Sequence, residues 1–189
     1  GIIGINGTGK TTFLRILAGL EEADEGQVIT QNGLRITYLP QHPQFPEGAT
    51  ILSYVTQGQK EQSWNPETEA HMVLNKLGIE DHEEEIEHLS GGQKKRVALA
   101  AVLVNPTDVL ILDEPITGLD PASTQDFYAV IRHLNRDEKV AVLMVSHDIG
   151  NIVTQANKIL QLKQTVQFYG TVDEYKKSEF GREFLGGEN

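Results

Sequence analysis

The chain has 189 residues, of which 39% are hydrophobic and 23% are charged. This length and composition predict a single globular domain over residues 1–189. It contains no cysteine, which excludes disulfides and zinc–cysteine sites and fits a cytoplasmic protein. The net charge of -11 argues against direct nucleic-acid binding. No apolar run is long enough to embed the chain itself in a membrane.

The predicted strands and helices alternate, which indicates an α/β fold with a mostly parallel sheet. Helices between about residues 45 and 105 indicate a helical subdomain inserted into this fold. The pair Asn32-Gly33 predicts a hairpin between its flanking strands. Strands are predicted at 2–3, 27–30, 34–39, 108–112, 140–145, 158–162 and 167–169. Helices are predicted at 11–18, 50–57, 67–77, 90–104, 121–134 and 148–156, with one or two short helices in 171–185.

Residues 4–11, Gly-Ile-Asn-Gly-Thr-Gly-Lys-Thr, connect the first predicted strand to the first helix; we call them the phosphate loop. Glycines let the backbone wrap closely, so that consecutive N–H groups point at phosphate oxygens, and the helix N-terminus adds its positive end. We expect Lys10 to reach the β- and γ-phosphates and the Thr11 hydroxyl to ligate Mg²⁺. The alternative is a plain glycine-rich turn between a strand and a helix.

Two carboxylates, Asp113 and Glu114, end the apolar run Val109–Leu112. A buried parallel strand delivers such residues to the carboxyl edge of the sheet, where ligands bind in open α/β folds. We expect Asp113 to hold Mg²⁺ through water and Glu114 to act as general base on the attacking water. Alone, the pair is equally compatible with a strand that runs into an acidic turn.

Residues 89–93, Leu-Ser-Gly-Gly-Gln, stand at the start of a predicted helix, with Ser90 as its N-cap; we call them the signature segment. The two glycines expose backbone N–H groups beside the Ser90 hydroxyl, which makes a second anion-binding helix terminus. By itself, Ser-Gly-Gly is also an ordinary helix cap.

Taken together, these motifs resemble the nucleotide-binding domain of an ATP-binding-cassette (ABC) ATPase along nearly the whole chain. The resemblance implies a P-loop NTPase fold with a RecA-like sheet, an inserted helical subdomain and an incomplete antiparallel β-subdomain. It also implies that Gln41 is the Q-loop glutamine and a further Mg²⁺ ligand, and that Asp120 belongs to the D-loop. His147, in Ser-His-Asp after a strand, matches the switch histidine; the other five histidines lack such a context and are expected on the surface.

The resemblance implies ATP hydrolysis between two copies of the chain arranged head to tail, with each signature segment completing the partner's site. Glu114, His147 and Gln41 are the implied catalytic group, and Mg²⁺ is the implied cofactor, held by Thr11, Gln41 and Asp113. The implied nucleotide contacts are Asn6, Gly7, Thr8, Gly9, Lys10, Thr11 and Thr12 on one copy, with Ser90, Gly91, Gly92, Gln93 and Asp120 on the other.

Two subfamilies are visible in the motifs. Residues 1 to about 112, including Arg35–Gln41 and Asn105–Asp108, resemble ABC-F proteins, which act on ribosomes. From about Gly118 onward, the sequence is similar to ATPases of zinc- or manganese-type metal importers. This leaves a mosaic, natural or engineered, joined near the strand predicted at 108–112, or an unusual member of one family. The strands that the family carries before its phosphate loop are absent, so we also expect weakened nucleotide affinity and stability.

Three functions follow from these resemblances. The first is an ABC-type ATPase that powers metal-ion import through a membrane permease, docked at the inner face of the membrane on a groove formed by the Gln41 loop and the helices at 50–77. The second is a ribosome-associated translation factor, although the two cassettes and charged linker of that class are missing. The third is a nucleotide-binding fragment or chimera without a physiological partner.

Overall fold

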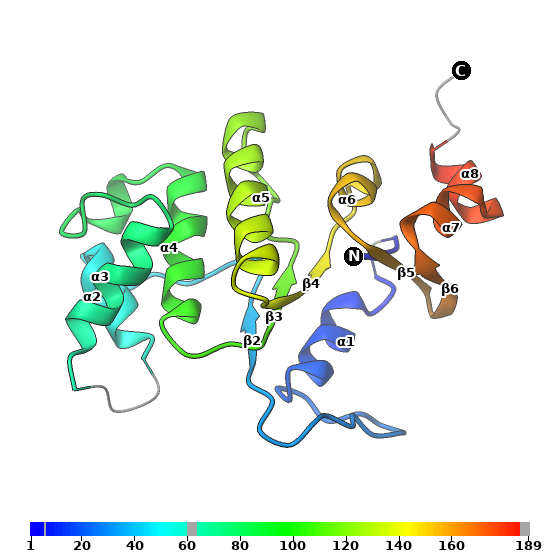
Figure 1. Ribbon diagram of the computed structural model, residues 1–189, viewed down its shortest axis with the longest axis horizontal. Coiled ribbons are helices and arrows are strands. Elements are labelled where there is room, and N and C mark those ends of the chain that lie inside the picture. The colour runs from blue at the N-terminus through cyan, green and yellow to red at the C-terminus, as the bar shows by residue number, and fades with distance from the viewer. Residues whose placement is uncertain (6, 60–63, 186–189) are drawn as a thin grey trace.

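The computed structural model describes residues 1–5, 7–59 and 64–185 (Figure 1). Its strands are β1 (Ile2–Ile3), β2 (Ile36–Leu39), β3 (Val109–Asp113), β4 (Ala141–Val145), β5 (Lys158–Lys163) and β6 (Thr165–Thr171). Its helices are α1 (Lys10–Leu17), α2 (Ile51–Gln57), α3 (Pro66–Lys76), the 3-10 helix η1 (Ile86–His88), α4 (Gly91–Leu103), α5 (Pro121–Arg136), α6 (Ile149–Gln155), α7 (Val172–Lys177) and α8 (Glu179–Leu185).

The strands form one sheet in the order β2-β3-β4-β1-β5-β6. All neighbouring pairs are parallel except β5 and β6, which correspond to the strands predicted at 158–162 and 167–169 and pair antiparallel. The mostly parallel α/β sheet is therefore confirmed. Because β1, β3 and β4 are parallel neighbours or lie one strand apart, the loops that follow them leave the sheet at the same edge.

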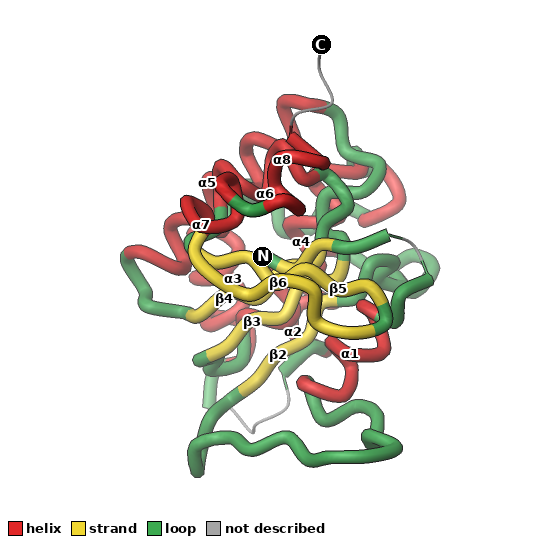
Figure 2. Tube along the Cα trace, turned by 90° about the vertical axis from the view of Figure 1, so that its right-hand side faces the viewer, coloured by secondary structure: helices red, strands yellow, loops and turns green. Residues whose placement is uncertain are grey.

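Apolar side chains cover both faces of the central strands, which explains why their sequences are continuous apolar runs. Ile2 and Ile3 are both fully buried but point into different cores. Ile3 joins the larger core, and Ile2 packs with Leu14 of α1 on the other face. Figure 2 shows the same division, with α5 to α8 on one side of the sheet and α1 on the other.

Helices α2, α3 and α4 contact one another and lie together beside β2 (Figure 1). Side-chain caps begin two of them: Ser90, the predicted cap, begins α4, and Thr50 begins α2, each accepting a hydrogen bond from the backbone N–H three residues later. α4 also contacts β2 and α5, so it connects this helical group to the sheet. Across the described parts of the chain, no helix is long and apolar enough to cross a membrane.

The predicted hairpin around Asn32-Gly33 is wrong. A turn does form there, since Gly33 has a φ of 79° and the Leu34 N–H bonds to the Gln31 carbonyl, but residues 27–30 are not a strand and Ile29 is 82% exposed. The second arm instead becomes β2, which pairs in parallel with β3. Burial of β2 against the sheet outweighs the local turn signal, because an isolated two-stranded hairpin is only marginally stable in water.

Candidate active site

The phosphate loop joins the end of β1 to the start of α1. Gly7 and Gly9 have φ values of 80° and 81°, a region that residues with a Cβ rarely adopt, and Gly9 is the N-cap of α1. Thr8 closes the turn by donating its hydroxyl hydrogen to the Ile5 carbonyl at 2.9 Å. The loop thus wraps before the helix N-terminus as the sequence predicts. Asn6, a predicted contact, lies outside the described residues.

Gly4 is required by a close backbone approach. A Cβ at this position would lie 2.4 Å from the carbonyl oxygen of Leu162 in β5 and 3.2 Å from the Thr8 hydroxyl. The first of these atoms belongs to the backbone of a neighbouring strand and cannot rotate away. The sheet therefore admits only glycine where the phosphate loop leaves it.

Lys10 is buried in the phosphate loop, with only 6% of its surface exposed. Its ammonium group donates to the carbonyl oxygens of Gly4 and Ile5, each at 2.9 Å. The next two residues, Thr11 and Thr12, are exposed at the first turn of α1. The positive charge and two hydroxyls are therefore placed at one helix N-terminus, as an anion site requires.

Asp113 ends β3 and is 2% exposed. Its Oδ2 accepts a hydrogen bond of 3.0 Å from the Tyr38 hydroxyl, while its Oδ1 is buried without a hydrogen-bond partner among the described residues. Burial and the neighbouring Asp113 carboxylate raise the pKa of Tyr38 well above its usual value. A buried carboxylate oxygen without a donor is costly, and a hydrated divalent cation would satisfy it.

Tyr38 is a site residue, although the sequence indicates only that it lies in the strand predicted at 34–39. It does lie in a strand, opposite Ile111 in the register of β2 with β3, and its hydroxyl positions Asp113. The alternation of β2 was visible in the sequence. Its pairing with β3 was not, because the chain between the two strands is long.

Replacing Tyr38 with Phe is expected to lower the free energy of unfolding by about 1–3 kcal/mol, because the second oxygen of the buried Asp113 also loses its donor. Urea unfolding without nucleotide or Mg²⁺ measures this. Tyr169→Phe is the matched control, since Tyr169 is 66% exposed, and it should change stability by little. Equal stability of Tyr38→Phe and wild type would contradict the role assigned to the hydroxyl.

Glu114 follows Asp113 with a φ of 44°, which is unusual for a residue with a side chain and is typical of functional turns. Its Oε2 accepts a hydrogen bond from the Gln41 amide at 2.9 Å and from the Thr117 hydroxyl at 3.4 Å. The same oxygen lies 3.2 Å from Nδ1 of His147. The three residues predicted to act together are therefore in contact, and Thr117 is an addition that the sequence did not indicate.

His147 is held by the loop that leaves β4. Ser146, which is buried, accepts a hydrogen bond from the Asp148 N–H, and Asp148 caps α6. The His147 side chain is 52% exposed, whereas that of Glu114 is 13% exposed. A cleft of about 410 Å³ opens beside them, and its lining includes Glu114, Thr117 and His147. The pair is therefore accessible to a small polar molecule from one side.

The signature segment forms the N-terminus of α4. Ser90 and Gln93 make a reciprocal capping box, in which the Ser90 hydroxyl accepts from the Gln93 N–H and the Gln93 side chain accepts from the Ser90 N–H. Ser90 and Gly91 are exposed, and Gly92 is buried against Ser123 of α5. Asp120 caps α5, and its carboxylate accepts from the Ser123 hydroxyl at 2.6 Å.

The signature segment does not belong to the same site as the phosphate loop of its own chain. α4 contacts α2, α3, α5 and β2, whereas α1 contacts β3 from the opposite face of the sheet. Figure 1 shows α4 and α1 on different sides of β2. Within one copy, the predicted nucleotide contacts therefore form two separate groups.

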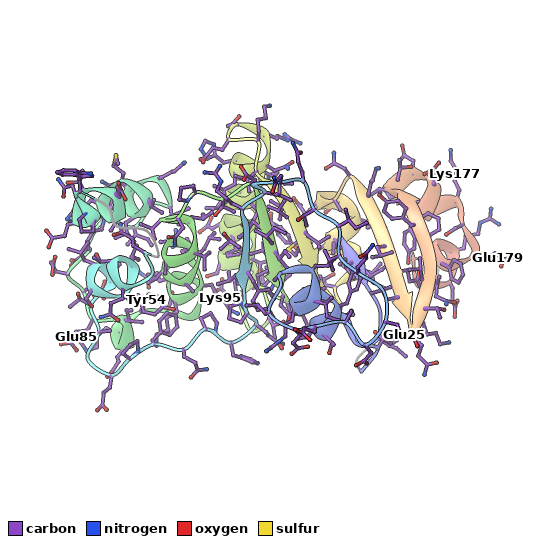
Figure 3. All side chains as sticks on the ribbon, turned by 90° about the horizontal axis from the view of Figure 1, so that it is seen from below. Glu25, Tyr54, Glu85, Lys95, Lys177 and Glu179 are labelled. Carbon is purple, nitrogen blue, oxygen red and sulfur yellow. The ribbon has the colours of Figure 1, made fainter. Side chains whose placement is uncertain are left out.

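Lys95 links the signature helix to the Gln41 loop. Its ammonium group donates to the backbone carbonyl of Gln41, and burial lowers its pKa from the usual value. Figure 3 labels Lys95 on α4, near the sheet. Sequence analysis did not single out this residue, because a lysine in a charged run on a helix is usually solvated. Through Gln41, the helix is connected to Glu114.

Comparisons with known proteins identify the family of the chain. The profile of a family described as "ABC transporter" matches residues 1–117. The zinc import ATP-binding protein ZnuC of Rickettsia conorii is 34% identical, over 95% of this chain and 77% of its own length. An uncharacterized ABC transporter ATP-binding protein, YfmR of Bacillus subtilis, is 31% identical over 87% of this chain. The chain spans only 32% of the length of YfmR.

A solved structure gives the same result. The inward-facing conformation of a putative metal-chelate type ABC transporter aligns with a TM-score of 0.87 and 25% identity, over 98% of this chain and 76% of that one. The matches to YfmR and ZnuC both cover most of the chain and so run across the suspected junction near residues 112–118. Neither match is confined to one side of that junction.

Proposed function

Since the chain belongs to the ABC transporter ATP-binding family, we propose that it binds MgATP at the phosphate loop and hydrolyses it to ADP and phosphate. The observation that carries this proposal is the contact of Glu114 with both Gln41 and His147 at the carboxyl edge of the sheet. These residues come from three separate loops. Gln41 and His147 both contact the same carboxylate oxygen of Glu114, and none of the three side chains caps any helix that the structure describes. A catalytic role therefore explains their arrangement better than a structural one.

The phosphate loop supplies the binding energy for the nucleotide. Backbone N–H groups of residues 7–12 and the Lys10 ammonium receive the phosphates, and Lys10 exchanges its bonds to the loop carbonyls for bonds to phosphate oxygens. Thr11, Asp113 and Gln41 would hold Mg²⁺. The Oδ1 of Asp113, which has no hydrogen-bond partner in the described part of the chain, suits a water molecule from the hydration shell of the cation. The cation supplies charge neutralisation between the phosphates.

Replacing Lys10 with Ala is expected to weaken ATP binding about 10- to 100-fold, because charge-assisted hydrogen bonds to the phosphates are lost. Calorimetric titration with a non-hydrolysable ATP analogue measures the change. Lys163→Ala, at an exposed position on the end of β5, controls for the loss of one positive charge. Unchanged affinity in Lys10→Ala would mean that the phosphate assignment is wrong.

Hydrolysis needs a base and an oriented water molecule. Glu114 is positioned to accept a proton from water as the water oxygen attacks the γ-phosphorus and the bond to the β-phosphate oxygen breaks. In this structure, Gln41 and His147 contact the Glu114 carboxylate. When ATP is bound, the same two side chains can instead contact the attacking water or the γ-phosphate. The products are ADP and phosphate, with the proton released to solvent.

A complete site requires two copies of the chain. Ser90 and Gly91 are exposed at the N-terminus of α4, which packs with the helical group and not with α1, the helix that follows the phosphate loop. In a head-to-tail pair, this terminus faces the γ-phosphate bound by the partner, and Asp120 lies on the adjoining start of α5. ATP would then bring two copies together, and hydrolysis would release them.

We propose that ATP hydrolysis by this chain powers metal-ion import through a membrane permease. Support comes from the relatives, since the ZnuC protein is named as a zinc import protein and the structural relative as a metal-chelate type transporter. These names favour import over the ribosome-associated alternative. The connection of Lys95 to the Gln41 backbone gives a route by which a permease docked on the helical group could act on Glu114.

Complementation between two inactive variants tests the shared site. Lys10→Ala removes phosphate binding, and Ser90→Arg blocks the signature segment. Each alone should be inactive, but in a mixed dimer one of the two sites carries neither substitution. The expected result is partial recovery of ATP hydrolysis on mixing, which increases with protein concentration. Activity of Ser90→Arg alone, or hydrolysis by wild type that is independent of concentration, would overturn the shared site.

A further inference from the structure

Two histidines outside the candidate active site meet in the helical group. His71 lies in α3, and His82 lies in the loop between α3 and η1. Their Nδ1 atoms are 2.5 Å apart, and the ring planes are inclined by 27°. The ring centres are 4.7 Å apart, much farther than the two nitrogens, so the rings meet edge to edge with the Nδ1 atoms between them. Both side chains are partly buried, unlike the surface histidines expected from the sequence.

The surroundings of His82 establish which of its nitrogens carries the proton. Its Nε2 lies 2.9 Å from the backbone carbonyl oxygen of Ile79, which can only accept a hydrogen bond. Nε2 is therefore the protonated nitrogen of neutral His82, and the lone pair on Nδ1 points at Nδ1 of His71. With both rings neutral, the one hydrogen between the two Nδ1 atoms belongs to His71, which donates it to His82.

We propose that His71 and His82 form a binding site for a late first-row divalent metal ion, for which Zn²⁺ is the test ion. A metal ion in place of this hydrogen would receive both Nδ1 lone pairs. Neutral imidazole nitrogens suit zinc, copper and nickel and not magnesium or calcium, which prefer oxygen ligands. The hydrogen bond from His82 Nε2 to a carbonyl is the orienting bond that metal-ligating histidines usually make.

The site needs a small rearrangement. Two nitrogens at about 2.0–2.1 Å from a tetrahedral zinc are farther apart than the present contact, so the rings must separate by roughly an ångström. Partial exposure of both rings permits this and leaves room for water ligands. Within the residues that the structure describes, no group of three or more histidine and carboxylate side chains converges on a metal position. The protein thus supplies two ligands, which makes the site weaker than a four-ligand structural zinc site.

The loop that carries His82 is hydrogen-bonded to the rest of the helical group. The loop around His82 carries Asp81 and Glu83 beside it, and Figure 3 labels Glu85 of this loop at the end of the molecule where α2 and α3 lie. The His82 carbonyl accepts a hydrogen bond from the Leu52 N–H of α2 at 2.8 Å. A metal ion bound by both histidines would therefore join α3 to a loop that is already bonded to α2.

Calorimetric titration of the untagged protein with Zn²⁺ at neutral pH, in excess Mg²⁺, tests the proposal. We expect one equivalent to bind, and His71→Gln and His82→Gln each to weaken binding about tenfold or more. His88→Gln, at an exposed position in the same region, is the matched control and should bind as wild type does. Circular dichroism verifies that each variant is folded.

A second measurement does not depend on the variants. Nitrogen-15 NMR of the histidine rings in wild type should show Zn²⁺ shifting the Nδ1 resonances of two of the six histidines. Saturable binding that survives in both variants would overturn the proposal, as would the absence of binding below about 1 mM. In that case the two rings share a hydrogen bond only. Neither measurement uses ATP hydrolysis, so both are independent of the proposed function.

Discussion

Glu114→Gln is expected to reduce ATP turnover by at least about 100-fold while leaving ATP binding intact, since a positioned general base contributes roughly 10²–10⁴ to the rate. The substitution removes the basic carboxylate and keeps the size of the side chain. Glutamine has the same length, and its carbonyl oxygen can still accept the hydrogen bond from Gln41. It has no basic oxygen with which to take a proton from water. The dimer closed by ATP should therefore accumulate.

Steady-state phosphate release and equilibrium ATP binding, both measured at several protein concentrations, check this expectation. Glu22→Gln, at an exposed position after α1, controls for the loss of one negative charge. Turnover within a few-fold of wild type would assign the proton transfer to another group. ATP binding with no turnover even in wild type would remove the hydrolytic function from this chain and leave nucleotide binding.

Gly92→Ala is expected to lower the free energy of unfolding by about 1–3 kcal/mol, the usual cost of forcing an extra methyl group into a packed contact. A Cβ at Gly92 would lie 2.7 Å from the Cβ of Ser123 and 2.5 Å from its hydroxyl oxygen. Ser123 cannot simply turn away, because its hydroxyl and N–H both bond to Asp120, the N-cap of α5. The starts of α4 and α5 would have to separate.

The adjacent glycine provides the matched control. A Cβ at Gly91 meets only Leu119 at 3.8 Å, an ordinary van der Waals contact. Gly91→Ala should therefore leave stability unchanged or raise it by about 0.5–1 kcal/mol, because glycine is the poorer helix residue. Urea unfolding of both variants without nucleotide gives the comparison. Equal effects at the two positions would show that the contact between α4 and α5 does not require glycine.

Helix starts and central strands were predictable because their signals are local. Ser90 and Thr50 begin their helices as predicted, since a side-chain oxygen can cap a backbone N–H only two or three residues away. The strands β3 and β4 were recognisable as uninterrupted apolar runs, which indicate burial on both faces. The Asn32-Gly33 turn was also predicted correctly. The hairpin inferred from it was not, because strand pairing depends on the whole sheet.

The phosphate loop could be identified from local sequence alone. Its glycines, lysine and threonine identify an anion site because backbone conformation at Gly7 and Gly9 and the helix N-terminus at Lys10 depend on near neighbours alone. The same is true of the signature segment, whose capping box closes within four residues. The family and its chemistry followed from these short motifs.

Which distant groups come into contact depends on how the strands and helices pack. Gln41 reaches Glu114 across 73 residues of chain, and Tyr38 reaches Asp113 across 75. Both contacts exist because β2 pairs with β3. The sequences of the two strands contain no feature that identifies them as neighbours in the sheet. The separation of the signature segment from its own phosphate loop was likewise decided by packing, since α4 joins the helical group beside β2 while α1 covers the opposite face of the sheet.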